Sequence, residues 1–451
     1  MKDLTQGSIL KHVLVMAMPI AIGMLLQTLY FVVDLYFVAK LGDAAVAGVS
    51  AAGNVMFVIM ALTQMVGVGT VALISHAVGR QDQHDANHIF NQSVVLSMVC
   101  ALLTLAGGFG LAESYMGVLG ADAATRAAGV TYLYWFTPGL AMQFALIVMG
   151  SALRGTGIVK PTMAVQAFTV VLNAALAPVL IAGWGTGYPM GVAGAALAST
   201  LSVAVGVVML TFYFLKLEHY VNFDLSQWSP KIDTWKRMLN IGLPAGGEFA
   251  LFAVFTGVIY WIIRDFGAAA QAGFGIGSRI MQMVFLPAMA IAFAAAPIAG
   301  QNFGAKNAAR VRETFRSAAL VSCAAMALLT LFSQWQGETL IRFFTTDAEV
   351  VRVGAQFLHI ISWNFVAIGL VFTCSSLFQA LGNTWPSFIS TGARLFIFAL
   401  PAIWLSRQPG FTLLQVWYLS VATSTFQALL SVWLLHGELR KRLLFARPEP
   451  A

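Results

Sequence analysis

Two apolar stretches decide the fold: residues 13–38, VLVMAMPIAIGMLLQTLYFVVDLYFV, and residues 239–263, LNIGLPAGGEFALFAVFTGVIYWII. Each is long enough to cross a bilayer as a helix, which takes about 20 apolar residues. Each contains a proline in its first third, and adding 225 to the number of Pro19 gives Pro244. The second stretch is therefore in register with the first, and the same offset can be followed along the chain.

The offset of 225 residues relates the two halves of the chain without a gap. It joins the pairs Gly42 and Gly267, Ala47–Gly48 and Ala272–Gly273, Met56 and Met281, Gly79 and Gly304, Gly157 and Gly382, and Pro161 and Pro386. Glycine and proline have special backbone requirements, so their agreement in one register indicates two homologous halves. In a strongly apolar chain, such a repeat is typical of a transporter whose site lies between two lobes.

The composition indicates a bilayer as the solvent. Apolar residues make up 59% of the chain and charged residues only 10%, against about 25% in soluble proteins. Long uncharged runs predict twelve spans, approximately 13–38, 47–73, 90–112, 128–151, 160–182, 190–215, 239–263, 272–299, 316–336, 353–380, 386–406 and 411–435. The three cysteines lie inside these runs and are expected to pack as small apolar residues.

The predicted fold is an all-α polytopic membrane protein with twelve transmembrane helices in two six-helix lobes. Residues 1–215 form the N-lobe, 216–238 a cytoplasmic linker, and 239–451 the C-lobe with a short cytoplasmic tail. Six spans return the chain to the face on which it started. The two halves are therefore expected to be parallel repeats, related by an axis along the membrane normal.

The distribution of lysine and arginine predicts the orientation. Most of these residues fall in segments that lie on one side if the N-terminus is inside, which places both termini in the cytoplasm. The net charge of +7 is then a topology signal, so no nucleic-acid partner is expected. The first apolar run is too long for a signal peptide and its repeat mate is internal, so we interpret it as a retained span.

Asp34 is the first candidate functional residue. Of the 18 acidic residues, only Asp34 and Glu248 fall well inside spans. A carboxylate at such depth is costly and usually faces a protein interior or a wet cavity. Gln27, Tyr30 and Asp34, together with Gly23, follow helical spacing on one face, which predicts a polar lining of a cavity. The alternative is an aspartate that reaches the outer interface or forms a structural pair.

Glu248 is predicted near mid-membrane, four residues after Pro244, and its repeat mate is Gly23. Because the N-lobe has no counterpart, we expect the lobes to differ, with Glu248 binding or gating the substrate. Arg279, the repeat mate of Asn54, is a second candidate for substrate contact. The structural alternative pairs Glu248 with Arg279 or Arg394, or bonds it to carbonyls freed at the Pro244 kink.

Asn173 and Gln166 share a face of the fifth span, and Asn173 could complete an oxygen-lined pocket with Asp34. Hydrogen bonding between helices is the alternative role for these amides.

The histidines at 76, 84 and 88 lie near a short loop and are interpreted as a solvated surface, so no metal site is predicted. The glycine-rich segments lack the context of a nucleotide site. We therefore expect a non-enzymatic protein without a cofactor, in which transport draws on an ion gradient or on a partner protein.

Several motifs resemble those of the multidrug and toxic compound extrusion family, over essentially the whole chain. They are Pro19, Asp34 and Leu41–Gly42 around the first span; Gly79; Leu153-Arg154-Gly155-Thr156-Gly157 with Pro161; Asn173 with Pro178; and Gly300-Gln301-Asn302-Phe303-Gly304-Ala305. The resemblance implies two six-helix lobes, a central cavity, and proton- or sodium-driven export of cationic amphiphilic compounds. It further implies that Asp34 is the cation-coupling residue, with Asn173 beside it. A monomer in the bacterial inner membrane, handling small molecules, is the matching expectation.

The chain departs from the family pattern at specific positions. Many members carry aspartate before the proline of the fifth span, where this chain has Ala177, and the tenth span has no acid. A sodium site built from several carboxylates is therefore disfavoured and proton coupling through Asp34 is favoured. Asn173, Asn54 and Ser199 could still offer neutral oxygens to Na⁺.

Two other functions stay open from the sequence. A lipid-linked precursor flippase of the same wider superfamily would need a cationic cavity, for which only Arg279 and Arg394 are candidates. An intramembrane enzyme or receptor-like protein would need a catalytic or receptor signature. No paired acids, metal ligands or Ser-Lys arrangement supports an enzyme.

Overall fold

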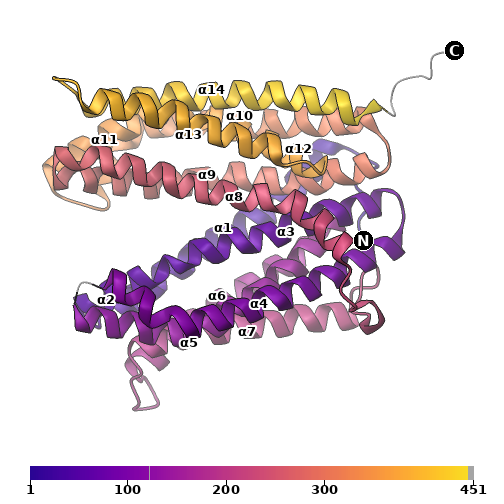
Figure 1. The fold of residues 1–451 in the computed structure, drawn as a ribbon, viewed down its shortest axis with the longest axis horizontal. Helices are drawn as coiled ribbons and strands as arrows, with labels where there is room; N and C mark the ends of the chain where they lie inside the picture. Colours follow the sequence, from indigo (N-terminus) through magenta and orange to yellow (C-terminus); the bar gives the residue numbers. More distant parts are fainter. Residues whose placement is uncertain (121, 445–451) are drawn as a thin grey trace. The chain divides into compact units, whose positions relative to one another are not determined.

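The computed structural model describes residues 1–120 and 122–444, and every regular element in them is a helix (Figure 1). The helices of the first half are α1 (Ile9–Ala39), α2 (Asp43–Gly53), α3 (Val55–Gly79), α4 (Gln83–Leu119), α5 (Ala123–Gly155), α6 (Lys160–Ala182) and α7 (Val192–Lys216). Those of the second half are α8 (Ile232–Ile263), α9 (Ala268–Gly304), α10 (Ala308–Arg342), α11 (Ala348–Ile361), α12 (Asn364–Ala380), α13 (Trp385–Ser406) and α14 (Leu413–Arg442). Two short 3₁₀ turns, η1 (Leu225–Gln227) and η2 (Arg264–Phe266), flank α8.

The number of spans agrees with the prediction. Within the described residues, 11 helical stretches are long and apolar enough to cross a membrane, and α11 with α12 makes a twelfth as a pair bent by 55°. The bend falls at Ser362 and Trp363, inside the predicted span 353–380. The helices of this all-α protein also expose large apolar side chains such as Leu102 (66%) and Leu320 (69%), as a lipid-facing surface requires.

The backbone confirms the repeat at residues with unusual conformations. The described non-glycine residues with positive φ are Gln81 (60°) and Lys306 (57°), which are 225 positions apart. Gly42 (φ 105°) and Gly267 (φ 90°) are another such pair, and each precedes the first turn of a helix in a conformation that only glycine adopts readily. The same turns therefore recur in both halves.

Helix caps repeat in the same register. Asp82 caps α4 by accepting from the Asp85 amide, and Asn307 caps α10 by accepting from the Arg310 amide. Asp122 and Asp347, again 225 apart, cap α5 and α11. Each cap satisfies amide groups that have no partner inside the helix.

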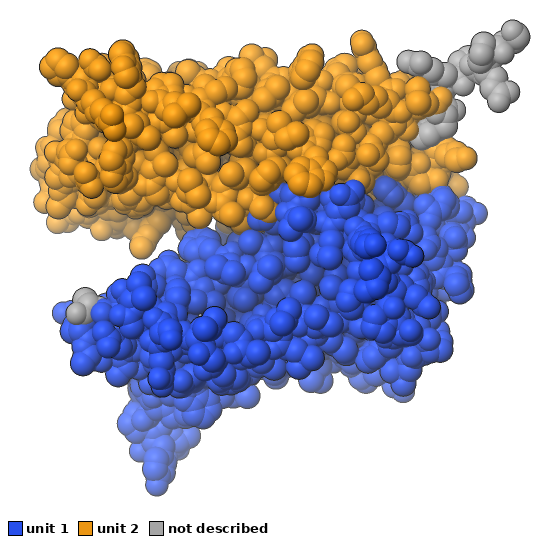
Figure 2. All heavy atoms as spheres, viewed as in Figure 1, with its two compact units in different colours: residues 1–3, 22–246 blue, residues 4–21, 247–451 orange. Residues whose placement is uncertain are grey.

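The chain divides into two compact units (Figure 2). Unit 1 consists of Met1–Asp3 and Ile22–Gly246, and unit 2 of Leu4–Ala21 and Gly247–Ala451. The division cuts α1 after Ala21 and α8 after Gly246, two positions that are also 225 residues apart. The units therefore differ from the predicted lobes, because the first half of each leading helix belongs to the unit built mainly from the other repeat.

In unit 1, α5 lies at the centre and packs against α2, α3, α4 and α7. The first half of α8 joins this unit through Met238, Ile241 and Ala245 in the apolar core. A Cβ at Gly242 would collide with the carbonyl oxygen of Met65, so the absence of a side chain lets α8 approach α3 closely. The stacked rings of Phe90 and Phe214, 4.8 Å apart, fill the same core.

The inter-repeat segment is bonded to α4 of unit 1. Asn91 donates to the Asn222 carbonyl (3.0 Å) and accepts from the Asp224 amide (2.9 Å). Gln92 donates to the carbonyls of Gln227 and Ser229. Because α8 begins at Ile232, the final residues of the predicted linker 216–238 are helical.

In unit 2, α9 packs against α10, α11 and α12, and α14 packs against α11, α12 and α13. The rings of Phe274, Phe357 and Trp417 form the centre of one apolar core, with Phe357 and Trp417 4.8 Å apart.

A polar clamp in unit 2 holds the N-terminal segment. The Gln301 side chain accepts from the Leu4 amide (3.0 Å), and Asn302 donates to the Leu4 carbonyl (3.1 Å). The Arg310 guanidinium donates to the carbonyls of Leu4 and Gly7. The sequence motif around Gly300–Ala305 thus fixes the start of α1 to unit 2.

Candidate functional site

Asp34 lies in the second half of α1, within unit 1, and its residue surface is 8% exposed. Its Oδ1 atom is buried and has no hydrogen-bond partner among the described residues. A buried carboxylate oxygen without a partner is costly, and a bound cation or proton would reduce this cost.

Hydroxyl and amide groups from three helices connect Asp34 to Asn173. Tyr30, one turn before Asp34, interacts with it electrostatically and hydrogen bonds to the Ser199 side chain on α7. Asn173 on α6 donates from Nδ2 to Ser199 Oγ at 3.4 Å. Asn173 and Ser199 are 0% and 1% exposed, so this cluster is inside unit 1. The connection between Asp34 and Asn173 therefore runs through Tyr30 and Ser199.

Tyr132 on α5 is a further member of this group, which we call the Asp34 cluster: Tyr30, Asp34, Tyr132, Asn173 and Ser199. Its phenol lies close enough to Asp34 and Tyr30 to interact with both electrostatically, and its residue surface is 6% exposed. The sequence analysis missed Tyr132, because an uncharged tyrosine in an apolar span carries no pattern that distinguishes it from a packing residue. Asn173 Oδ1 is also buried without a hydrogen-bond partner, and so offers a second free oxygen.

Gln27 lies toward the other end of the predicted polar face. Its Oε1 accepts from Gln166 Nε2 on α6 at 3.2 Å. A Cβ at Gly23 would lie 2.6 Å from Gln166 Oε1, so Gly23 leaves room for this amide to reach α1. Gln27 itself is exposed, unlike Asp34. The polar face thus runs from an exposed amide pair to a buried carboxylate.

Glu248 lies at the start of the part of α8 that belongs to unit 2. It hydrogen bonds to the Ser387 side chain on α13, while its Oε1 atom is buried without a partner. Ser387 is the neighbour of Phe388, whose ring lies where a Cβ on Gly247 would be. The second half thus holds its own buried carboxyl group, between α8 and α13.

The arginines proposed as structural partners do not form an ion pair with Glu248 among the described residues. Arg279 on α9 is exposed, and the ion pairs found lie elsewhere. Arg394 lies 4.5 Å from the centre of the Phe255 ring, and its NH1 is 3.4 Å from Gln427 Oε1. Its Nε atom is buried without a partner. Phe255 lies seven residues after Glu248 on α8, and Arg394 lies seven residues after Ser387 on α13. The pair Phe255 and Arg394 therefore lies on the same helix faces as the pair Glu248 and Ser387.

The histidines near the loop after α3 do not converge on a metal site. His88 contacts Thr234 Oγ1 at 3.1 Å, and Asp85 pairs with Arg80 at 2.6 Å. No group of three or more His, Cys, Asp or Glu side chains with metal-binding geometry occurs in the described ranges.

Comparison with known proteins assigns the family. A family model described as MatE matches residues 19–179 and again residues 244–405, two blocks whose starts are 225 residues apart. The chain belongs to the MatE family. Membership makes it a multi-pass membrane transporter, and the double match agrees with the repeat in sequence and backbone.

Curated relatives of this MatE chain align over most of its length. It is 28% identical to the "Probable multidrug resistance protein YpnP" of Bacillus subtilis (strain 168), over 92% of this chain and 90% of the relative. It is 27% identical to the "Probable multidrug resistance protein NorM" of Thermotoga maritima, over 97% and 94%. The "Multidrug export protein MepA" of Staphylococcus aureus (strain MSSA476) is 24% identical, over 84% and 83%.

Solved structures share the fold. A MOP superfamily transporter from Pyrococcus furiosus, described as having a binding pocket of reversed polarity, superimposes with a TM-score of 0.91 at 23% identity, covering 97% of this chain and 98% of that one. A MATE family transporter in an outward-facing conformation gives a TM-score of 0.91 at 23% identity with the same coverage. At this identity the likeness defines the architecture alone.

Proposed function

We propose that this MatE transporter is a cation-coupled antiporter that exports organic, mostly cationic amphiphilic compounds by alternating access. The observation that carries the proposal is the buried Oδ1 atom of Asp34, which has no hydrogen-bond partner among the described residues and lies near Tyr30, itself bonded to Ser199. Such a group can hold a cation in one state and release it in another, which an antiporter requires. The names of the relatives, multidrug resistance and multidrug export proteins, support a range of xenobiotic cargo.

The coupling ion is H⁺ or Na⁺, and the composition of the Asp34 cluster favours H⁺. The cluster contains one carboxyl, and its other members offer phenol, hydroxyl and amide groups. A single carboxyl is enough to carry a proton. Sodium prefers several oxygen ligands, and the free Oδ1 of Asn173 is the best neutral one available here. No cofactor enters this proposal.

Glu248 is proposed to bind or gate the cationic substrate. Its free Oε1 is buried in unit 2, and Phe249, Phe252 and Tyr260 lie on the same helix. A carboxylate with aromatic rings favours an organic cation in a site of low dielectric constant. Gln27 and Tyr30 are proposed as further lining. Arg279 is exposed, which favours a peripheral role over direct contact with the charge of a cation.

The protein is proposed to act as a monomer in the plasma membrane, the inner membrane of a bacterium, with both termini in the cytoplasm. The orientation rests on the lysine and arginine bias of the loops. The flippase alternative is not favoured, because the unpartnered carboxyl oxygens of Asp34 and Glu248 within the spans suit cations rather than a pyrophosphate.

Transport into proteoliposomes with separately imposed gradients tests this function. A fluorescent organic cation such as ethidium should enter vesicles with an acidic lumen in exchange for protons that leave. This uptake should stop when the pH gradient is dissipated. Transport that continues without any ion gradient contradicts antiport. A pH gradient that has no effect while a Na⁺ gradient drives movement reverses the choice of ion.

A further inference from the structure

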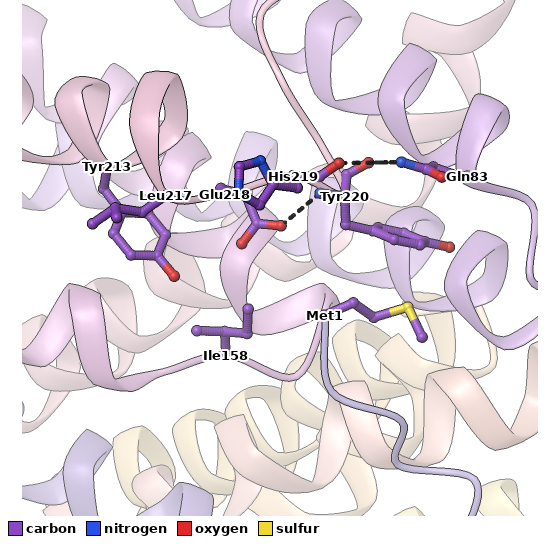
Figure 3. A pocket seen from close by; sticks show the side chains of 8 residues that line it. All are labelled: Met1, Gln83, Ile158, Tyr213, Leu217, Glu218, His219 and Tyr220. Atoms are coloured by element: carbon purple, nitrogen blue, oxygen red, sulfur yellow. Dashed lines mark hydrogen bonds between the residues drawn. The ribbon is translucent and has the colours of Figure 1, made fainter.

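A cavity of about 520 Å³ lies in unit 1 at the junction of α7 and the inter-repeat segment (Figure 3). Its lining includes Tyr213, Leu217, Glu218 and Tyr220 from this junction and Ile158 from the turn after α5. The volume is within the range of small-molecule sites, about 300–1,000 Å³. None of the lining residues belongs to the Asp34 cluster or contacts Glu248.

The Glu218 carboxylate carries the negative charge of this cavity, whose lining also includes Met1 with its N-terminal amine, Gln83 and His219. Its residue surface is 5% exposed, and Oε1 accepts from the Tyr220 amide at 2.9 Å. Among the described residues no lysine, arginine or histidine forms an ion pair with it. A bound cation would stabilise a carboxylate this buried, because one backbone hydrogen bond replaces only part of its lost hydration.

Two tyrosine rings and apolar side chains line the cavity beside this carboxylate, together with the polar side chains of His219 and Gln83. Figure 3 shows the Glu218 carboxylate between the rings of Tyr213 and Tyr220 in that view, with Ile158 below. Tyr213 lies close enough to Glu218 for an electrostatic interaction. Tyrosine faces attract cations, and Leu217 and Ile158 favour alkyl substituents over hydration water. A metal ion would need more oxygen ligands than this single carboxylate, whereas an ammonium with carbon substituents matches both the charge and the lining.

We propose that this cavity binds an organic ammonium cation, with Glu218 against the charge and the tyrosine rings against its substituents. The ligand class follows from the lining alone and does not rest on the proposed transport function. A soluble amine and the headgroup of phosphatidylethanolamine share this chemistry.

Equilibrium binding of radiolabelled tetraethylammonium to the full-length protein in nanodiscs tests the site. Asp34→Asn with Glu248→Gln forms the background, so that the two acids inside the spans do not contribute. We expect one saturable site, whose affinity falls on the order of tenfold or more in Glu218→Gln, since the charged partner is lost. Glutamine keeps an oxygen for the Tyr220 amide. Glu113→Gln is the matched control, because Glu113 is an exposed carboxyl that accepts from Tyr134 (3.3 Å) and should leave binding unchanged.

Two lipid compositions separate the sources of the ligand. Weaker binding in discs that contain phosphatidylethanolamine than in phosphatidylglycerol discs identifies the lipid headgroup as a competitor. Equal binding in both identifies a site for soluble amines. Tyr213→Leu should also weaken binding severalfold, which keeps the proposal testable if Glu218→Gln does not fold. Unchanged affinity in Glu218→Gln, or no saturable binding in phosphatidylglycerol discs, overturns the proposal.

Discussion

Asn173 on α6 donates from Nδ2 to the Oγ atom of Ser199 on α7 at 3.4 Å, and Ser199 in turn hydrogen bonds to Tyr30. This hydroxyl links an amide on α6 to the phenol of Tyr30, which interacts with Asp34 electrostatically. The arrangement distinguishes the carboxyl that we propose to exchange a cation from the polar groups around it.

Removing the Ser199 hydroxyl tests whether this group is required for proton-driven efflux. Ser199→Ala should keep efflux driven by a pH gradient, with a rate reduced less than about tenfold, because a neutral hydrogen bond contributes about 0.5–1.5 kcal/mol. Initial rates in proteoliposomes measure this. Complete loss of proton-driven efflux, with normal insertion in the membrane, would show that the hydroxyl is itself required for coupling. Ser202→Ala is the control, since Ser202 Oγ bonds only within α7, to the Ala198 carbonyl.

Glu248→Gln should raise the KM for monovalent organic cations on the order of tenfold while efflux remains dependent on the ion gradient. The charge that stabilises the cation disappears, whereas glutamine can still hydrogen bond to Ser387. Ethidium concentration series in vesicles measure the change, with Glu113→Gln as the exposed control. An unchanged KM would exclude Glu248 from cation binding.

The clamp on the N-terminal segment predicts a stability effect. Arg310→Ala removes the hydrogen bonds to the Leu4 and Gly7 carbonyls and should destabilise the protein by about 2 kcal/mol. A thermal unfolding series in detergent shows this as a lower midpoint. Arg312→Ala, two residues along and exposed, should leave the midpoint unchanged. Equal midpoints for both variants would contradict a stabilising clamp.

Close packing of α8 on α3 makes Gly242 intolerant of a side chain. Gly242→Ala places a methyl group against the Met65 carbonyl and should cost about 1–3 kcal/mol through overpacking. The same thermal series applies. Gly257→Ala on the same helix meets nothing within 4 Å, so it should be neutral or stabilising. A neutral Gly242→Ala would show that the two helices separate easily.

The sequence predicted the elements of this fold well because apolar runs and the repeat are local or periodic signals. The offset pairs Gly42 with Gly267, and both have positive φ angles and precede helices in the structure. The division of α1 after Ala21 was not predictable, since an apolar face does not specify which helices will cover it. The bend at Ser362 was missed for a related reason: neither proline nor glycine marks it.

The candidate site was predictable only in part. An acid in an apolar span is a strong signal, and both Asp34 and Glu248 have a buried oxygen without a hydrogen-bond partner. Tyr132 and Ser387 gave no signal, because their roles depend on contacts with helices distant in the sequence. The suggested partnership of Glu248 with an arginine followed from charge alone, and geometry places Ser387 beside it instead.

The most direct test of the central claim is ethidium efflux by Asp34→Asn in proteoliposomes with an imposed pH gradient. Asparagine has the shape of aspartate but cannot exchange a proton or pair with a cation as a carboxylate does. The variant should insert in the membrane, have the thermal unfolding midpoint of the wild type and still bind ethidium. It should nevertheless show no gradient-driven efflux. Efflux at the wild-type rate and with the wild-type dependence on pH would contradict the account and remove Asp34 from the coupling mechanism.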